Sequence, residues 1–141
     1  MEETLLDKGY LIIAPIGTSM LPLIRPNRDV TVLKKKTLPP KKYDVVLYKR
    51  NSGSYILHRI LKITPDGYII CGDNQFIKEY GVKEEQILGI MDGFYRDNKY
   101  IDTSNPFGKA AVAATKTFGP ALIEDVMSKY IEDPDSFKSE P

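Results

Sequence analysis

The chain has 141 residues, of which 42% are hydrophobic and 28% are charged, so its size and composition favour one folded domain over a disordered or multispanning protein. The formal net charge is only +1, and without an overall basic field we expect no nucleic-acid partner. One cysteine and one histidine supply neither an internal disulfide nor a zinc cluster, so we expect no metal and no cofactor.

No segment of the chain has the length and hydrophobicity of a membrane-spanning helix. The longest uncharged stretch is the 16 residues between Lys8 and Arg25, whereas a spanning helix needs about 20 apolar residues. The first residues include Glu2 and Glu3, where a secretory signal carries basic residues. We therefore expect a soluble, cytoplasmic chain whose contact with a membrane is peripheral or made through a membrane-protein partner.

Short runs of β-branched and aromatic residues, divided by turn residues, continue from about Tyr10 to Ile101 and predict a mainly β domain over residues 1–104. Turn chemistry at residues 51–53 and 65–67 separates neighbouring runs. The expected strands are Asp29–Lys35, Asp44–Arg50, Ser54–Ile63, Gly67–Cys71, Ile87–Arg96 and Lys99–Ile101.

Beyond Asn105 the chain becomes rich in alanine and loses the short β period, which predicts a helical C-terminal extension over residues 105–141. We expect one or two helices, with an interruption at Gly119 and Pro120. The last ten residues contain four acidic side chains and one lysine, a composition typical of a frayed tail.

Ser19 is the first candidate catalytic residue. It lies among small and apolar residues in the hexapeptide Gly17–Pro22, directly after an apolar run. A serine hydroxyl is a poor nucleophile unless a neighbouring base takes its proton. Standing alone, the hexapeptide is also compatible with an ordinary turn.

His58 is the second candidate, and as the only histidine it is the only side chain whose ordinary pKa suits a general base near neutrality. On a strand it shares a face with Ile56 and Ile60, so a semi-buried structural histidine is the alternative. Asp73, in Gly72-Asp73-Asn74, is either part of a turn or an acid that orients the imidazole.

Four segments occur in a characteristic order: residues 17–22, Asp44-Val45-Val46, His58-Arg59-Ile60 and Gly72-Asp73-Asn74. Together they resemble the ordered boxes of the signal peptidase I superfamily, which includes the LexA-like peptidases. The resemblance covers about residues 11–102. Bacterial signal peptidases and LexA-like proteins carry a lysine at the histidine position. The histidine here is similar to the Ser-His branch of archaeal, endoplasmic-reticulum and sporulation-type signal peptidases.

The resemblance implies a LexA- and signal-peptidase-like β fold of mostly antiparallel strands and a serine endopeptidase that cleaves leader or signal-type peptides. The substrate would bind as a β-strand, with small side chains near the scissile bond. By the resemblance Ser19 is the nucleophile, its backbone N–H contributes to the oxyanion hole, and His58 is the general base. Asp73 or Glu79 is the acid that faces His58. Beside the serine, Met20 and Pro22 are the candidate substrate-binding residues.

The chain also departs from the superfamily pattern. Only 16 residues precede Gly17, too few for the anchoring helix of a signal peptidase or the DNA-binding domain of a LexA-type repressor. Two alternatives therefore stay open: a catalytically inactive peptide-binding or regulatory module on the same fold, and a LexA-like self-cleaving peptidase.

Five lysines bracket the Pro39-Pro40 turn and form either a solvated loop or a surface for an anionic membrane or an acidic partner. They are Lys34, Lys35, Lys36, Lys41 and Lys42.

Overall fold

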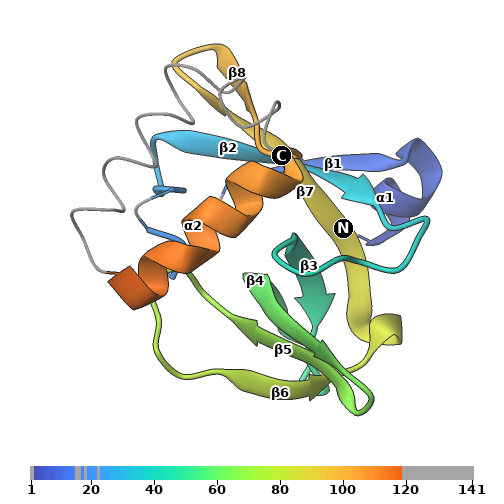
Figure 1. Cartoon of the computed structure of the whole chain (residues 1–141). Helices are drawn as coiled ribbons and strands as arrows, with labels where there is room; N and C mark the ends of the chain where they lie inside the picture. Colours follow the sequence, from blue (N-terminus) through green and yellow to red (C-terminus); the bar gives the residue numbers. More distant parts are fainter. Residues whose placement is uncertain (1, 15–16, 18, 22, 119–141) are drawn as a thin grey trace.

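The computed structural model describes residues 2–14, 17, 19–21 and 23–118 (Figure 1). The mainly β prediction is confirmed, because this part of the chain forms one antiparallel sheet of eight strands with a helix at each end. None of these helices is long and apolar enough to cross a membrane. The expected interruption at Gly119 and Pro120 and the expected frayed tail lie outside the described residues.

In chain order the elements are α1 (Glu2–Lys8), β1 (Tyr10–Ile13), β2 (Asp29–Lys35), β3 (Val45–Lys49), β4 (Tyr55–Thr64), β5 (Gly67–Cys71), β6 (Glu79–Val82), the 3-10 helix η1 (Glu84–Gln86), β7 (Ile87–Arg96), β8 (Lys99–Asp102) and α2 (Pro106–Phe118). The strands β2, β5 and β7 have the predicted bounds, and the ends of β3 and β4 differ from the prediction by one residue. Four elements were not predicted individually, namely α1, β1, β6 and η1.

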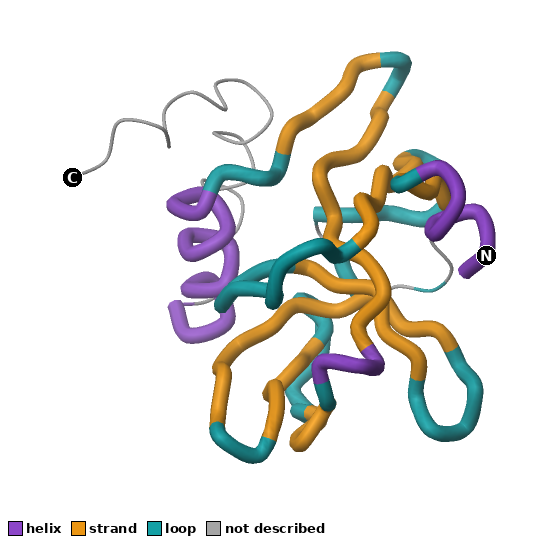
Figure 2. Tube along the Cα trace, turned by 90° about the vertical axis from the view of Figure 1, so that its right-hand side faces the viewer, coloured by secondary structure: helices purple, strands orange, loops and turns teal. Residues whose placement is uncertain are grey.

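The order of strands in the sheet is β1-β2-β7-β3-β4-β5-β6, and β8 pairs with β7. The ten-residue strand β7 joins the two parts of the sheet, because it pairs with β2 from Gly89 to Arg96, with β3 near its start and with β8 near its end. Register shifts interrupt both its β2 and its β3 ladders. Such bulges bend a strand and increase its twist, which accounts for the curved sheet of Figures 1 and 2.

Two separate hydrophobic cores pack against the sheet, and the central strand β3 contributes to both of them. On β3, Val45 and Leu47 belong to one core and Val46 and Tyr48 to the other, as the alternation of a strand requires. The first core is also built from Met20, Leu23, Ile24, Leu33, Met91, Phe94, Ile101 and Val112, and the second from Ile60, Tyr68, Ile70, Val82 and Ile87.

The helix α2 closes the first core, since Val112 on this helix is buried there (Figure 1). An ion pair of 2.5 Å joins Nζ of Lys109 on α2 to Oδ1 of Asp44, and both side chains are largely buried. Asp44 also accepts a hydrogen bond of 2.8 Å from the backbone N–H of Lys41. The C-terminal helix is therefore held both by apolar contacts and by a charge pair.

Candidate active site

Ser19 lies in the connection between β1 and β2, and the residues around it determine its position. Gly17 has a φ of +82°, a left-handed conformation that glycine adopts without steric cost. Met20 is buried in the first core, and its carbonyl accepts a hydrogen bond of 3.1 Å from the N–H of Ile24. Ser19 is therefore a half-buried residue directly before a turn that is anchored in the core.

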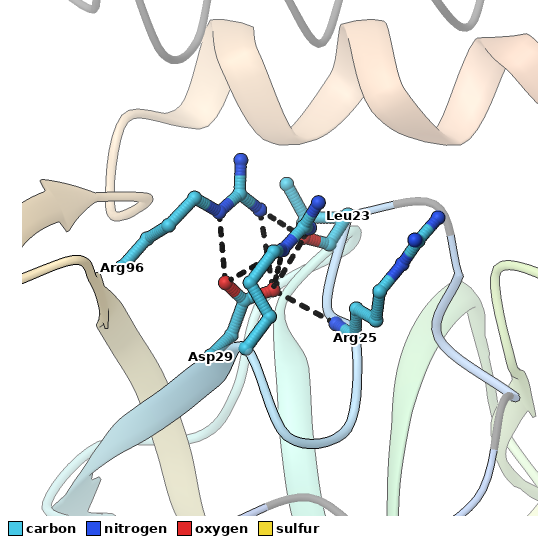
Figure 3. Close-up of polar contacts among 5 residues, drawn as sticks. Leu23, Arg25, Asp29 and Arg96 are labelled. Carbon is cyan, nitrogen blue, oxygen red and sulfur yellow. Dashed lines mark hydrogen bonds and ion pairs between the residues drawn. The ribbon is translucent and has the colours of Figure 1, made fainter.

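A buried carboxylate, that of Asp29, holds the end of this connection where it enters β2 (Figure 3). It accepts hydrogen bonds from the guanidinium groups of Arg96 and Arg28 and from the backbone N–H of Arg25. Arg96 also donates to the carbonyl of Leu23, at 3.0 Å. Burial raises the pKa of Asp29, but the hydrogen bonds from Arg96 and Arg28 outweigh it, so that this pKa lies below its usual value.

His58 lies on β4 opposite Val46 of β3, and its residue is only 7% exposed. Its ring packs edge-on to the ring of Tyr48, with 6.4 Å between the ring centroids. The prediction that Ile56 and Ile60 share one face of the strand is confirmed, because both pack with the second core, whereas Leu57 packs with the first.

Ser19 and His58 come together at Gly72, although all three are distant in sequence. A Cβ atom on Gly72 would lie 2.6 Å from the carbonyl oxygen of Ser19 and 3.1 Å from Cδ2 of His58. The contact with the Ser19 carbonyl is shorter than a Cβ atom tolerates and the contact with His58 is tight, so a glycine lets the serine turn and the histidine strand approach this closely.

The Gly72-Asp73-Asn74 segment is also fastened to the serine turn by its backbone. The N–H of Asn74 donates to the carbonyl of Ser19 at 2.8 Å, and the N–H of Asp73 contacts Sδ of Met20 at 3.4 Å. This segment thus holds the position of Ser19 through main-chain interactions, whatever its side chains contribute.

The carboxylate of Asp73 forms a buried ion pair with Arg59. The distances are 2.8 Å from Nε to Oδ1 and 3.0 Å from Nη2 to Oδ2, and the side chains are 2% and 6% exposed for Arg59 and Asp73. Arg59 also donates to the carbonyl of Tyr43 at 2.9 Å. Because Arg59 follows His58 on β4, the pair connects the histidine strand to the loop that holds Ser19.

Glu79, at the start of β6, interacts electrostatically with His58. Its Oε1 accepts hydrogen bonds from Oη of Tyr48 at 2.8 Å and from the guanidinium of Arg50 at 2.9 Å. Burial raises the pKa of Glu79, but the hydrogen bonds from Arg50 and Tyr48 and the positive charge of Arg50 and His58 bring it below its usual value. Glu79 is thus ionised at neutral pH and electrostatically coupled to His58.

A mostly apolar groove of about 400 Å³ opens beside Ser19 and His58. It is lined by Ile13, Ala14, Gly17, Ser19, Met20, Ile24, Leu47, Tyr55, Ile56, Leu57 and His58. The lining includes the end of β1, which is an outer strand of the sheet. It also includes the first residues of β4, which precede the ladder with β5, because that ladder begins at Arg59. An extended peptide can add to strand edges of this kind.

The structure brings together most of the predicted site residues. Met20 lines the groove, whereas Pro22 lies outside the described residues. The roles of Asp73 and Glu79 toward His58 stay predictions, but the structure gives each a defined partner. Sequence reasoning missed Tyr48, Arg50 and Arg59 as parts of the site. Only Arg59 carried a signal, since an arginine inside an apolar strand requires a buried acid.

Other chemistry has less support at this site. Cys71 is 2% exposed, and its thiol donates to the carbonyl of Gln75 at 3.2 Å, an environment typical of an unreactive buried thiol. Within the described residues, no group of three or more histidine, cysteine or acidic side chains is arranged to hold a metal ion.

Comparison of the chain with protein-family models, with curated proteins and with solved structures gave no significant match.

Proposed function

We propose that the chain is a serine endopeptidase of the signal-peptidase type, which cleaves an extended segment of a leader or signal-type peptide. The observation that supports this proposal most is the close approach of Ser19 and His58 at Gly72. The only histidine in the chain shares one groove with the serine that the motif singles out. Apolar residues line most of this groove, so the pair is partly shielded from water, and electrostatic interactions within the groove are stronger than in bulk solvent.

In the proposed reaction His58 takes the proton of Oγ of Ser19 as this oxygen attacks the carbonyl carbon of the scissile bond. The negative charge on the carbonyl oxygen is stabilised by backbone donors, among them the N–H of Ser19. His58 then gives its proton to the leaving amine as the C–N bond breaks. In the second half of the reaction His58 takes a proton from a water molecule as this water attacks the acyl-enzyme. The protonated His58 then returns the proton to Oγ of Ser19 as the ester C–O bond breaks.

The substrate would enter between β1 and β4 as an additional strand. Its main chain would bond to the edges at Ile13 and Tyr55, and its side chains would pack on the apolar lining. Leu47, Met20 and Ile24 line the same groove and would contact these side chains.

The two acids would act differently on His58. Asp73 would act as a positioning residue, because its ion pair with Arg59 fixes the strand that bears His58. Glu79 would act through charge, since it lies behind Tyr48 and favours the protonated imidazole that forms during the reaction.

A fluorophosphonate probe, which reacts with activated serines, tests the proposal. We expect stoichiometric labelling at Ser19 in the parent chain and none in Ser19→Ala or His58→Gln. The matched control is Ser52→Ala, which removes an exposed serine outside the groove and keeps full labelling. Circular dichroism establishes that each variant is folded. Labelling that persists in His58→Gln, or that maps to another serine, would refute the Ser-His pair.

The same samples separate the alternative functions. A folded chain that binds a leader peptide without reacting with the probe is a peptide-binding module. Loss of mass from the incubated parent chain, absent in Ser19→Ala, indicates self-cleavage.

The roles of the two acids are tested by the pH dependence of labelling. We expect Glu79→Gln to shift the pH profile of labelling toward lower pH, since the protonated imidazole loses a favourable charge. We expect Asp73→Asn to lower the stability of the fold, and to change the pH of half-maximal labelling less than Glu79→Gln does.

A further inference from the structure

A second cleft, of about 340 Å³, lies beside the loop between β2 and β3 and shares no lining residue with the groove at Ser19. Its lining comes from the end of β2, this loop, β7 and the start of α2. Five lysines line the cleft, namely Lys34, Lys35, Lys41, Lys42 and Lys109. The fold thus concentrates positive charge in a chain whose net charge is only +1.

Two aspartates also line this cleft, and each is already paired with one of the lysines. Lys109 contacts Asp44 at 2.5 Å, and Lys34 contacts Asp92 at 3.2 Å. These pairs use the only acidic side chains of the described lining. The remaining charge at the cleft is therefore positive.

Lys35, Lys41 and Lys42 supply this remaining charge. All three are exposed, and none has an ion pair within 4.0 Å in the described part of the chain. Three unbalanced positive charges around a concave surface attract an anionic group, such as a phosphate, at short range.

Exposed apolar side chains accompany these lysines. Leu38 lies in the loop between them and is 71% exposed, and the adjacent Pro39 is also exposed. Tyr10, which is 47% exposed, pairs with Lys34 across the β1–β2 ladder. An acidic peptide would satisfy the lysines alone, whereas the surface of a bilayer accommodates cations at its phosphates and leucine and tyrosine at its interface.

We propose that the basic loop face, consisting of Lys34, Lys35, Leu38, Lys41 and Lys42, docks on the surface of an anionic phospholipid bilayer. A lipid phosphate occupies the cleft, and the side chain of Leu38 enters the interface. This inference does not depend on the proposed peptidase activity, because the cleft and the groove at Ser19 have separate linings.

Co-sedimentation with vesicles tests this proposal. The full chain is mixed with vesicles of phosphatidylcholine, with or without phosphatidylglycerol, at low and at high salt. We expect binding only to the anionic vesicles, reduced by salt. Each neutralised lysine should weaken binding about fivefold, which corresponds to about 1 kcal/mol. The triple variant Lys35→Gln/Lys41→Gln/Lys42→Gln should therefore bind roughly 100-fold more weakly.

A matched triple variant controls for the loss of charge. Lys62→Gln/Lys78→Gln/Lys83→Gln removes three exposed lysines that do not line the cleft, and it should keep most of the binding. Leu38→Ser should weaken vesicle binding without any change in charge. Both triple variants and Leu38→Ser should keep parental fluorophosphonate labelling, if the parent chain is labelled, which separates this test from that of the peptidase.

Three results would overturn the docking proposal. The first is equal binding to neutral and anionic vesicles, and the second is equal loss in the two triple variants. The third is binding of soluble poly-glutamate or glycerol phosphate without any binding to vesicles, which would identify the cleft as a site for an acidic protein or a free phosphate.

Discussion

The ion pair between Arg59 and Asp73 gives the sharpest stability prediction, because it joins the histidine strand to the loop that holds Ser19. The side chains are 2% and 6% exposed. Arg59→Met keeps much of the volume of the side chain but leaves the carboxylate of Asp73 without its two guanidinium hydrogen bonds and the carbonyl of Tyr43 without its donor. Removing one partner of a buried pair costs about 3–5 kcal/mol, a large fraction of the stability of a typical domain.

Urea denaturation followed by circular dichroism measures this free energy of unfolding. Tyrosine fluorescence is a second probe, since the chain has nine tyrosines and no tryptophan. The double variant Arg59→Met/Asp73→Asn also removes the buried negative charge that has lost Arg59, and it should be more stable than Arg59→Met alone. The control Glu84→Gln breaks a more exposed pair, in which the side chains of Lys36 and Glu84 are 20% and 48% exposed, and should cost only about 0–1 kcal/mol.

The reasoning fails if Arg59→Met lowers the free energy of unfolding by less than about 1 kcal/mol, because losing the guanidinium of Arg59 from a buried carboxylate should destabilise the fold by more than that. It also fails if the effects of Arg59→Met and Asp73→Asn simply add in the double variant. Additive effects would mean that the two side chains stabilise the fold independently. In either case the pair would not be what holds β4 to the loop at Gly72.

Two further predictions follow from buried contacts around the site. Because folding lowers the pKa of Asp29, its stabilisation is present above the ordinary carboxyl pKa of about 3.9 and is lost as the pH falls through the folded value. Asp29→Asn should therefore be less stable than the parent at neutral pH, by a margin in urea denaturation that shrinks on acidification; a margin independent of pH would contradict this. Gly72→Ala should lower the free energy of unfolding by about 1–3 kcal/mol and slow fluorophosphonate labelling, since the new methyl group meets the Ser19 carbonyl at 2.6 Å. Unchanged stability and labelling would show that the loop relaxes without moving Ser19.

The strands could be located from the sequence wherever several buried side chains define them. β2 alternates between buried and half-buried positions over Asp29–Val32, and β7 does so along most of its length. Both strands were predicted with the observed bounds. Their periodicity is visible in the sequence because one face of each strand is packed against the core.

Two of the missed elements, α1 and β6, lack such a pattern. In β6, Val82 is the only buried residue of four, and in α1 only Leu5 is buried. One apolar contact cannot define a period, so these elements depend on tertiary contacts with β5 and with β1 and β2. Local preference was too weak to reveal them.

The amino-acid sequence specifies the reactive groups of this protein. It contains one histidine, a serine in a distinctive hexapeptide and two acids after a strand, and its strand pattern predicted the mainly β fold. Which of these groups contact one another depends on the tertiary structure. Gly72 brings Ser19 and His58 together, Arg59 binds Asp73, and the phenol of Tyr48 binds Glu79. These contacts depend on the register and curvature of the whole sheet, which packing sets over many residues at once and no short motif encodes.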